Sequence, residues 1–129
     1  LTVVNPPVRI SGMIDRLDAD THGTGYSLMD YKTGSARNPD PNQLKLMALM
    51  AYAHFPSLDI IKASLMFVAH DTLVFEQYRR GDTDSMWRVF EPDLQRLQLA
   101  HQNNQWPENP GFLCRKWCPV KTCRFNGER

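Results

Sequence analysis

The sequence predicts an α/β domain with the order β-β-α-β-β-α, followed by an irregular tail that holds all the cysteines. Runs of β-branched and aromatic residues come in two pairs, and each pair is separated by polar or glycine-bearing residues, as in hairpins. A segment rich in helix-forming residues follows each pair. The length of 129 residues suits one domain with a modest core. We therefore expect a single domain over residues 1–129, with a core at 8–105 and a tail at 106–129.

The first predicted hairpin joins the strands Val8–Asp15 and Tyr26–Lys32 across the polar segment DADTHGTG. A Pro/Gly/Asn-rich loop, TGSARNPDPN, follows the second strand, and a helix is predicted from Pro41 to Pro56. Its apolar residues recur at near-helical spacing, which predicts that they pack in the core. They are Leu44, Met47, Leu49, Met50 and Ala51.

The second predicted hairpin lies in residues 59–80, where two β-branched and aromatic runs flank the turn sequence AHDT. A second helix follows, with Pro92 as the expected bend or break between two pieces. Its predicted apolar stripe consists of Met86, Val89, Phe90, Leu94, Leu97 and Leu99.

Composition excludes some classes of protein. Hydrophobic residues make up 42% and charged residues 22% of the chain, as in soluble globular proteins. No apolar run reaches the roughly 20 residues of a membrane helix, and the first residues lack a secretory pattern, so we expect a cytoplasmic protein. The formal net charge of +1 neither indicates nor excludes a nucleic-acid partner.

The stretch SLMDYKTG ends an apolar strand on an aspartate and a lysine two positions apart. Asp15 ends the first predicted strand and Asp30 lies on its partner, so the two carboxylates can converge and form a site for Mg²⁺ or Mn²⁺. Strand alternation points Lys32 to the same side as Asp30, where an ammonium group can orient an attacking water. The alternative is an exposed, salt-bridged strand end, which a short motif matches by chance.

Three elements occur together: GMIDRLD, then MDYKTG about fifteen residues later, then a helix that starts QLKLMALMAYA. In this order and spacing they resemble the RecB-like branch of the PD-(D/E)XK nuclease superfamily, as found in phage and CRISPR-adaptation exonucleases. The resemblance runs from about Val8 to Val68. It implies a restriction-endonuclease-like core, in which a mixed central β-sheet is flanked by helices.

The resemblance also implies roles for individual residues. Asp15 and Asp30 would hold the Mg²⁺ or Mn²⁺ ion together with the backbone carbonyl of Tyr31, and Lys32 would be the catalytic lysine. Gln43 matches the glutamine that positions the lysine or the DNA. The family has a tyrosine four residues after this glutamine, where this chain has methionine, so no role is transferred there.

Arg16, the arginine of the DR pair, is a candidate for a supporting ion pair or a phosphate contact. The family also has a preceding helical segment that supplies a histidine ligand and a glutamate. The resemblance starts near the beginning of this sequence and therefore leaves the metal site one ligand short. A partner subunit is one expected source of that segment.

The tail holds Cys114, Cys118 and Cys123. Its sequence LCRKWCPVKTC resembles the C-terminal segment of RecB-like nucleases, in which three late cysteines and one early cysteine hold a [4Fe-4S] cluster. A cluster or a Zn²⁺ ion needs about four ligands, and the fourth here could be His101, His70 or a cysteine upstream. The alternative, free buried cysteines, has equal weight.

The tail also mixes aromatic and basic residues, as DNA-binding surfaces do. The alternative is a solubilising tail in which Trp106 and Trp117 cover the core. The candidate DNA-binding residues of the tail are Arg115, Lys116, Lys121 and Arg124.

The sequence is therefore interpreted as a metal-dependent DNA nuclease of a bacterial or phage-infected cell. We expect an exonuclease that acts on single-stranded or duplex ends in recombination, repair or phage DNA metabolism, with no membrane contact and with a homo-oligomer among the expected states. One alternative is a catalytically weak DNA-binding or scaffold subunit of the same fold. Another is a nuclease for RNA or branched DNA.

Overall fold

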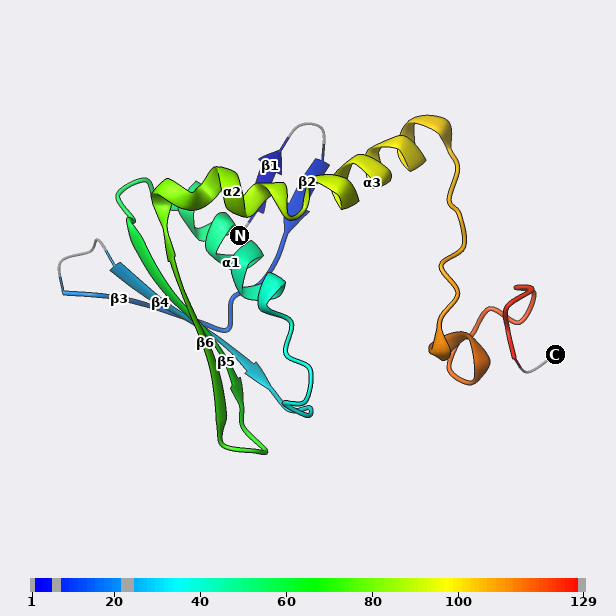
Figure 1. Cartoon of the computed structure of the whole chain (residues 1–129), viewed down its shortest axis with the longest axis horizontal. Coiled ribbons are helices and arrows are strands. Elements are labelled where there is room, and N and C mark those ends of the chain that lie inside the picture. Colours follow the sequence, from blue (N-terminus) through cyan, green and yellow to red (C-terminus); the bar gives the residue numbers. More distant parts are fainter. Residues whose placement is uncertain (1, 6–7, 22–24, 128–129) are drawn as a thin grey trace. The chain divides into compact units, whose positions relative to one another are not determined.

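The computed structural model describes residues 2–5, 8–21 and 25–127. The chain divides into two units, Leu1–Gln95 and Arg96–Arg129 (Figure 1). The division lies inside helix α3 (Glu91–Asn103), whereas the sequence analysis expected the tail to begin at residue 106. All of the sheets belong to the first unit.

A mixed sheet of four strands forms the centre of the first unit. Its strands are β3 (Arg16–Ala19), β4 (Gly25–Lys32), β5 (Ile60–Phe67) and β6 (Thr72–Arg79), in the spatial order β3-β4-β5-β6. Strands β3 and β4 are antiparallel, β4 and β5 are parallel, and β5 and β6 are antiparallel. The hairpin β5–β6 is the second hairpin that the sequence predicts, so that prediction is confirmed.

Helix α1 (Pro41–His54) makes the crossover between the parallel strands β4 and β5. Proline suits the first helical turn because that turn does not use its N–H. The N-cap residue Asp40 accepts a hydrogen bond on Oδ1 from the backbone N–H of Asn42 over 3.0 Å. The predicted helix start at Pro41 is therefore confirmed.

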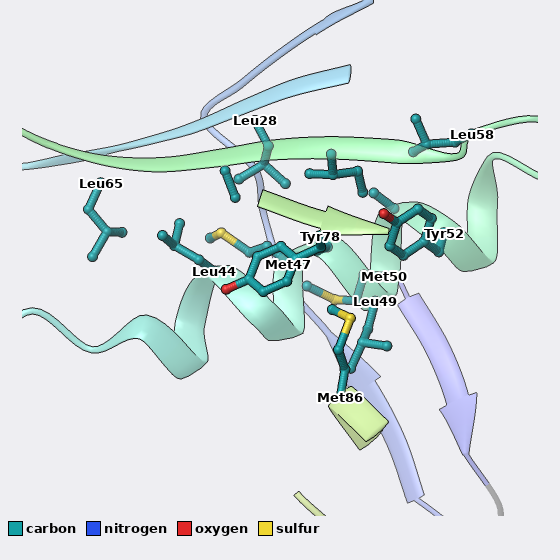
Figure 2. Close-up of a cluster of buried hydrophobic side chains, with 14 of the residues drawn as sticks. Leu28, Leu44, Met47, Leu49, Met50, Tyr52, Leu58, Leu65, Tyr78 and Met86 are labelled. Atoms are coloured by element: carbon teal, nitrogen blue, oxygen red, sulfur yellow. The ribbon is translucent and has the colours of Figure 1, made fainter. Parts of the chain in front are cut away.

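The core lies between α1 and one face of the sheet (Figure 2). Helix α1 contributes a nearly continuous buried stretch. Alternate residues of β4 and β5 on the facing side of the sheet pack against it. Every residue of the apolar set predicted for this helix is buried. Fully buried large side chains are Leu28, Leu44, Leu49, Leu58, Ile61 and Leu65.

The guanidinium group of Arg80 closes the C-terminal end of α1. It donates hydrogen bonds to the backbone carbonyls of Leu58 over 2.6 Å, of Tyr52 over 3.3 Å and of Phe55. It also lies over the ring of Tyr52, 5.0 Å from the centroid. One side chain thus donates to three carbonyls at the end of the helix and in the following turn, where the last helical carbonyls have no intrahelical donor.

The first predicted hairpin is present, but its first strand was assigned wrongly. Residues 8–15 do not form one strand paired with β4. Instead β2 (Val8–Ser11) pairs with β1 (Thr2–Asn5) in a separate two-stranded sheet, and the four-residue β3 pairs with β4. The turn of the β3–β4 hairpin includes residues 22–24, which lie outside the described residues. The predicted order β-β-α-β-β-α is found from β3 onward.

The predicted break at Pro92 is also found. A 3₁₀ turn at Arg80–Asp82 leads into α2 (Thr83–Arg88). Helix α3 then begins at Glu91. The apolar stripe expected along both pieces is buried only in part. Met86 is buried, but Val89, Leu97 and Leu99 are exposed, and none of the residues of α3, all of which are described, is buried.

The second unit contains a short 3₁₀ helix, Phe112–Arg115, and a series of turns up to Gly127. Asn126, 5% exposed, ties these turns together by donating from Nδ2 to the carbonyls of Cys118 and Val120, each over 3.1 Å. In the described part of both units, no helix has the length and apolar character to span a bilayer.

Candidate functional site

Alternation along β4 brings two ionisable residues to the side of the sheet that α1 covers. Leu28 and Asp30 are buried and Lys32 is half-buried on that side, whereas Tyr31, between the last two, is 43% exposed. Successive side chains of a strand point to opposite faces. The residue that packs in the core and the two that carry charge therefore share one face.

The carboxylate of Asp30 lies between Gln43 of α1 and Lys32. Gln43 donates from Nε2 to Oδ1 of Asp30 over 3.1 Å. The Nζ atom of Lys32 lies 2.7 Å from Oδ2, with side-chain exposures of 31% for the lysine and 10% for the aspartate. This contact is an ion pair, and it gives the buried Oδ2 atom its charged partner, Lys32.

Asp15 reaches the same strand from the segment that precedes β3. Its Oδ2 atom accepts a hydrogen bond from the backbone N–H of Tyr31 over 2.9 Å. Asp15 directly precedes Arg16, which the β3–β4 register pairs with Met29, the residue before Asp30. The structure thus places the two predicted acids on neighbouring segments at one end of β4.

The acids suit a hard divalent cation. Mg²⁺ and Mn²⁺ prefer carboxylate and carbonyl oxygens, and positive charge stabilises a buried carboxylate such as Asp30, which here faces Lys32. Asp15, Asp30 and the carbonyl of Tyr31 are the oxygen donors that the sequence predicts. The described residues include no group of three or more His, Cys, Asp or Glu side chains that could hold a metal, so among them the candidate carboxylate donors are Asp15 and Asp30.

Asp40 supports the site and was not singled out in the sequence. Its side chain caps α1, and its carbonyl accepts a hydrogen bond from the backbone N–H of Gln43 over 3.2 Å. The glutamine that holds Asp30 is therefore itself held in the first turn of α1. An aspartate directly before a proline at a helix start is the signal that identifies such a cap.

Arg16 makes the ion pair that the sequence analysis named as one alternative. Its Nε atom lies 2.6 Å from Oδ2 of Asp18, and both side chains are more than half exposed. The hydrogen bond with Asp18 is the main reason why the pKa of Arg16 is raised, and the phenol group of Tyr31 adds to it. Arg16 thus occupies the surface beside the segment that carries Asp15.

A cavity of about 300 Å³ lies at the start of β4 and not at the acids. Its lining includes Asp18, Gly25, Tyr26 and Lys62 but neither Asp15 nor Asp30. The candidate site is at the other end of the strand, where Asp30 and Lys32 lie. The cavity is therefore separate from the two acids.

The three cysteines of the second unit are free and half-buried. Their backbone carbonyls accept hydrogen bonds from one segment: Cys114 from Gly127, Cys118 from the side chain of Asn126, and Cys123 from the backbone of Asn126. No group of three metal-binding side chains is found among the described residues. The predicted cluster or zinc ion thus has no support in this geometry.

The basic residues of the tail differ in their surroundings. Arg124 is engaged with Glu108, 3.2 Å away, and lies over the ring of Phe125 at 4.8 Å. Arg115 and Lys116 are exposed. Within the second unit, Trp106 and Trp117 are 56% and 72% exposed.

Comparison with known proteins gives one match. A sequence model described as the PD-(D/E)XK nuclease superfamily matches residues 1–123, which is nearly the whole chain. A search of curated proteins and a search of solved structures found no match. The mixed four-stranded sheet with its helices agrees with the restriction-endonuclease-like core that the sequence resemblance implies, so the predicted fold class is confirmed.

Proposed function

We propose, since the chain belongs to the PD-(D/E)XK nuclease superfamily, that its site hydrolyses DNA phosphodiester bonds with the help of Mg²⁺ or Mn²⁺. The observation that carries this proposal is the surroundings of Asp30. Its carboxylate is buried, accepts a hydrogen bond from Gln43 on Oδ1 and forms an ion pair with Lys32 through Oδ2. The side chain of Lys32 is 31% exposed, so this ion pair is open to a ligand that enters from solvent.

Asp15, Asp30 and the carbonyl of Tyr31 would hold the ion. When bound, the ion supplies positive charge that stabilises a phosphate and activates water. Gln43 keeps the Asp30 carboxylate in one orientation through Oδ1. Such contacts to a metal ligand fix its position and are costly to remove.

Lys32 carries the remaining chemistry of this site. Its ammonium group lies beside Asp30 and is partly exposed, so it can donate hydrogen bonds both to the carboxylate and to a molecule that enters from solvent. In hydrolysis, a water oxygen forms a bond to phosphorus and the bond from phosphorus to the leaving oxygen breaks. The proton that the water gives up to solvent is balanced by one that the leaving oxygen takes up. We assign Lys32 the task of orienting that water and stabilising the negative charge on the phosphate.

The test uses end-labelled linear DNA, single-stranded and duplex, with Mn²⁺, Mg²⁺ or EDTA. The wild type is compared with Lys32→Ala and Asp30→Asn, and with Lys62→Ala as the matched control, because Lys62 is an exposed lysine on the neighbouring strand β5. Ion-dependent cleavage that both site variants lose and the control keeps would support the proposal. Cleavage that persists in EDTA or in Lys32→Ala would overturn it.

The preferred substrate, within this proposal, is a DNA end, as in the RecB-like exonucleases that the sequence resembles. Closed circular DNA separates the two modes of cleavage, because an exonuclease leaves it intact. A labelled RNA and a branched DNA junction in the same assay test the other nucleic-acid substrates. Cleavage of circular DNA would replace the exonuclease assignment with an endonuclease.

A second candidate function is a DNA-binding or scaffold subunit with weak cleavage. It is favoured by one observation: the described residues bring together two acids and no third metal-binding side chain. DNA binding without ion-dependent cleavage would select this candidate. Mixing the chain with a partner that restores cleavage would return the site to the nuclease assignment.

A further inference from the structure

Gly12 lies directly against helix α1, three residues before Asp15. A Cβ atom added at Gly12 would stand 2.7 Å from Cε and 3.4 Å from Sδ of Met50. Carbon atoms in contact are normally about 3.5–4.0 Å apart. Any side chain at this position must therefore move the glycine segment or Met50.

Met50 has little free space around it. It is 3% exposed and belongs to the core cluster that α1 forms with the sheet; Figure 2 shows it in this cluster, together with Leu49 and Met86. Methionine adapts its shape more easily than branched residues. A single added methyl group at Gly12 thus requires a small shift of the end of the Met50 side chain, and a larger side chain requires a larger shift.

The face of α1 that carries Met50 also contacts Asp30, the second acid of the site. Gln43 and Met50 are seven residues apart in α1, which is about two turns, so they lie on one face about 10 Å apart along the axis. Gln43 holds Asp30 through its hydrogen bond, and Met50 faces the segment that leads to Asp15. One helix face therefore meets both segments that carry the acids.

We propose that Gly12 is a positioning residue: the absence of its side chain lets the Asp15 segment close onto Met50, so that α1 sets the positions of both acids. This inference rests on the proposed function, because it concerns the pair of acids assigned to the ion. Between Gly12 and Asp15, the half-buried Ile14 packs against the core. A displacement at Gly12 is thus passed on to Asp15 and weakens its hydrogen bond with the N–H of Tyr31.

The experiment compares Gly12→Ala and Gly12→Val with the wild type in two measurements. The first is hydrogen exchange at the Tyr31 amide in metal-free protein, since Asp15 is the acceptor of that N–H. The second is the affinity for Mn²⁺ by calorimetry. Gly81→Ala is the matched control, because a Cβ atom at Gly81 meets nothing within 4 Å. The double variant Gly12→Ala with Met50→Ala removes the steric contact again.

We expect the Tyr31 amide to exchange about tenfold faster in Gly12→Val, less so in Gly12→Ala, with parallel losses of Mn²⁺ affinity. Gly81→Ala should match the wild type, and the double variant should regain slow exchange at Tyr31 relative to Gly12→Ala. Unchanged exchange in Gly12→Val overturns the proposal. Equal acceleration at the amides of the central strand β5 also overturns it, since that result shows general destabilisation.

Failure of the proposed function is distinguishable from failure of this inference. If the wild type binds no Mn²⁺ and cuts no DNA, the assignment of the acids to an ion is wrong. The exchange rate at Tyr31 still reports whether Gly12 positions Asp15, because it is measured without metal.

Discussion

The side chain of Gln43, in the first turn of α1, donates a hydrogen bond over 3.1 Å to Asp30 of the inner strand β4. The bond joins the two elements that enclose the core, and it engages the oxygen of Asp30 that Lys32 does not contact. Removal of the amide leaves a buried carboxylate oxygen without its donor, which is costly at such a depth.

We therefore expect Gln43→Ala to lower the rate of ion-dependent DNA cleavage by about 10–100-fold, the usual effect of losing a group that orients a metal ligand. Steady-state kinetics with Mn²⁺ titrated at fixed DNA measures it. Gln77→Ala, at an exposed position of β6, is the control and should keep wild-type kinetics. A Gln43→Ala variant as active as the control would show that this hydrogen bond does not serve catalysis.

Arg80→Lys is expected to lower the free energy of unfolding by about 2 kcal/mol or more. A lysine cannot reproduce the forked contacts with three carbonyls, and carbonyls at a helix end then lose their donors. Urea unfolding followed by circular dichroism measures the change. The neighbouring Arg79 is exposed, so Arg79→Lys should leave stability within about 0.5 kcal/mol of the wild type; equal effects of both variants would contradict the role of Arg80.

Stability is expected to fall steeply above pH 10. Burial raises the pKa of Tyr52 to about 12 and that of Tyr78 to about 12, whereas a tyrosine in the unfolded chain titrates near pH 10. The unfolded state therefore loses protons first as the pH rises, so the stabilisation is complete below pH 10 and is lost between pH 10 and 12.

Thermal unfolding between pH 8 and 11.5 measures this loss. The double variant Tyr52→Phe with Tyr78→Phe removes both phenol groups and should show a shallower decline over the same range. An identical decline in the double variant would assign the alkaline instability to other groups.

Asn126→Ala is expected to expose the three cysteine thiols. The variant loses both hydrogen bonds from Nδ2 to the turns at Cys118 and Val120, and the half-buried thiols then react faster with a thiol reagent. We expect an increase of about tenfold in the labelling rate under native conditions. Asn103→Ala, at an exposed position near the end of α3, is the control and should be labelled at the wild-type rate. A wild-type labelling rate in Asn126→Ala would show that the turns keep their structure without this side chain.

Local signals in the sequence predicted much of the fold. Pro41 marks the start of α1, Pro92 marks the break between α2 and α3, and AHDT marks the turn between β5 and β6. Each of these features depends on the conformational limits of one or two residues, so a short stretch of sequence is enough to reveal it.

Features that depend on distant contacts could not be predicted in the same way. The run Val8–Ser11 reads as a strand, but nothing in it reveals that its partner is Thr2–Asn5 instead of β4. The predicted apolar stripe includes Leu97 and Leu99, which are 40% and 56% exposed, because periodicity identifies a face but not what covers it.

The candidate site was predicted in part for the same reason. The alternation of Asp30 and Lys32 is a local property of a strand, and it placed both on one face. The hydrogen bond between Asp15 and the N–H of Tyr31 and the close approach of Gly12 to Met50 join segments that are 16 or more residues apart. Such contacts follow only from the folded arrangement.

Strand β4 buries Leu28 completely on the face that also carries Asp30 and Lys32. A slip of one residue in the pairing of β4 would turn Leu28 toward solvent and Tyr31 toward the core, and it would carry both charged groups away from α1 at the same time. Misfolded forms in which the hydrophobic core is complete but the acids face the wrong way are thereby disfavoured. The burial of Leu28 thus selects the strand register in which Asp30 and Lys32 face α1.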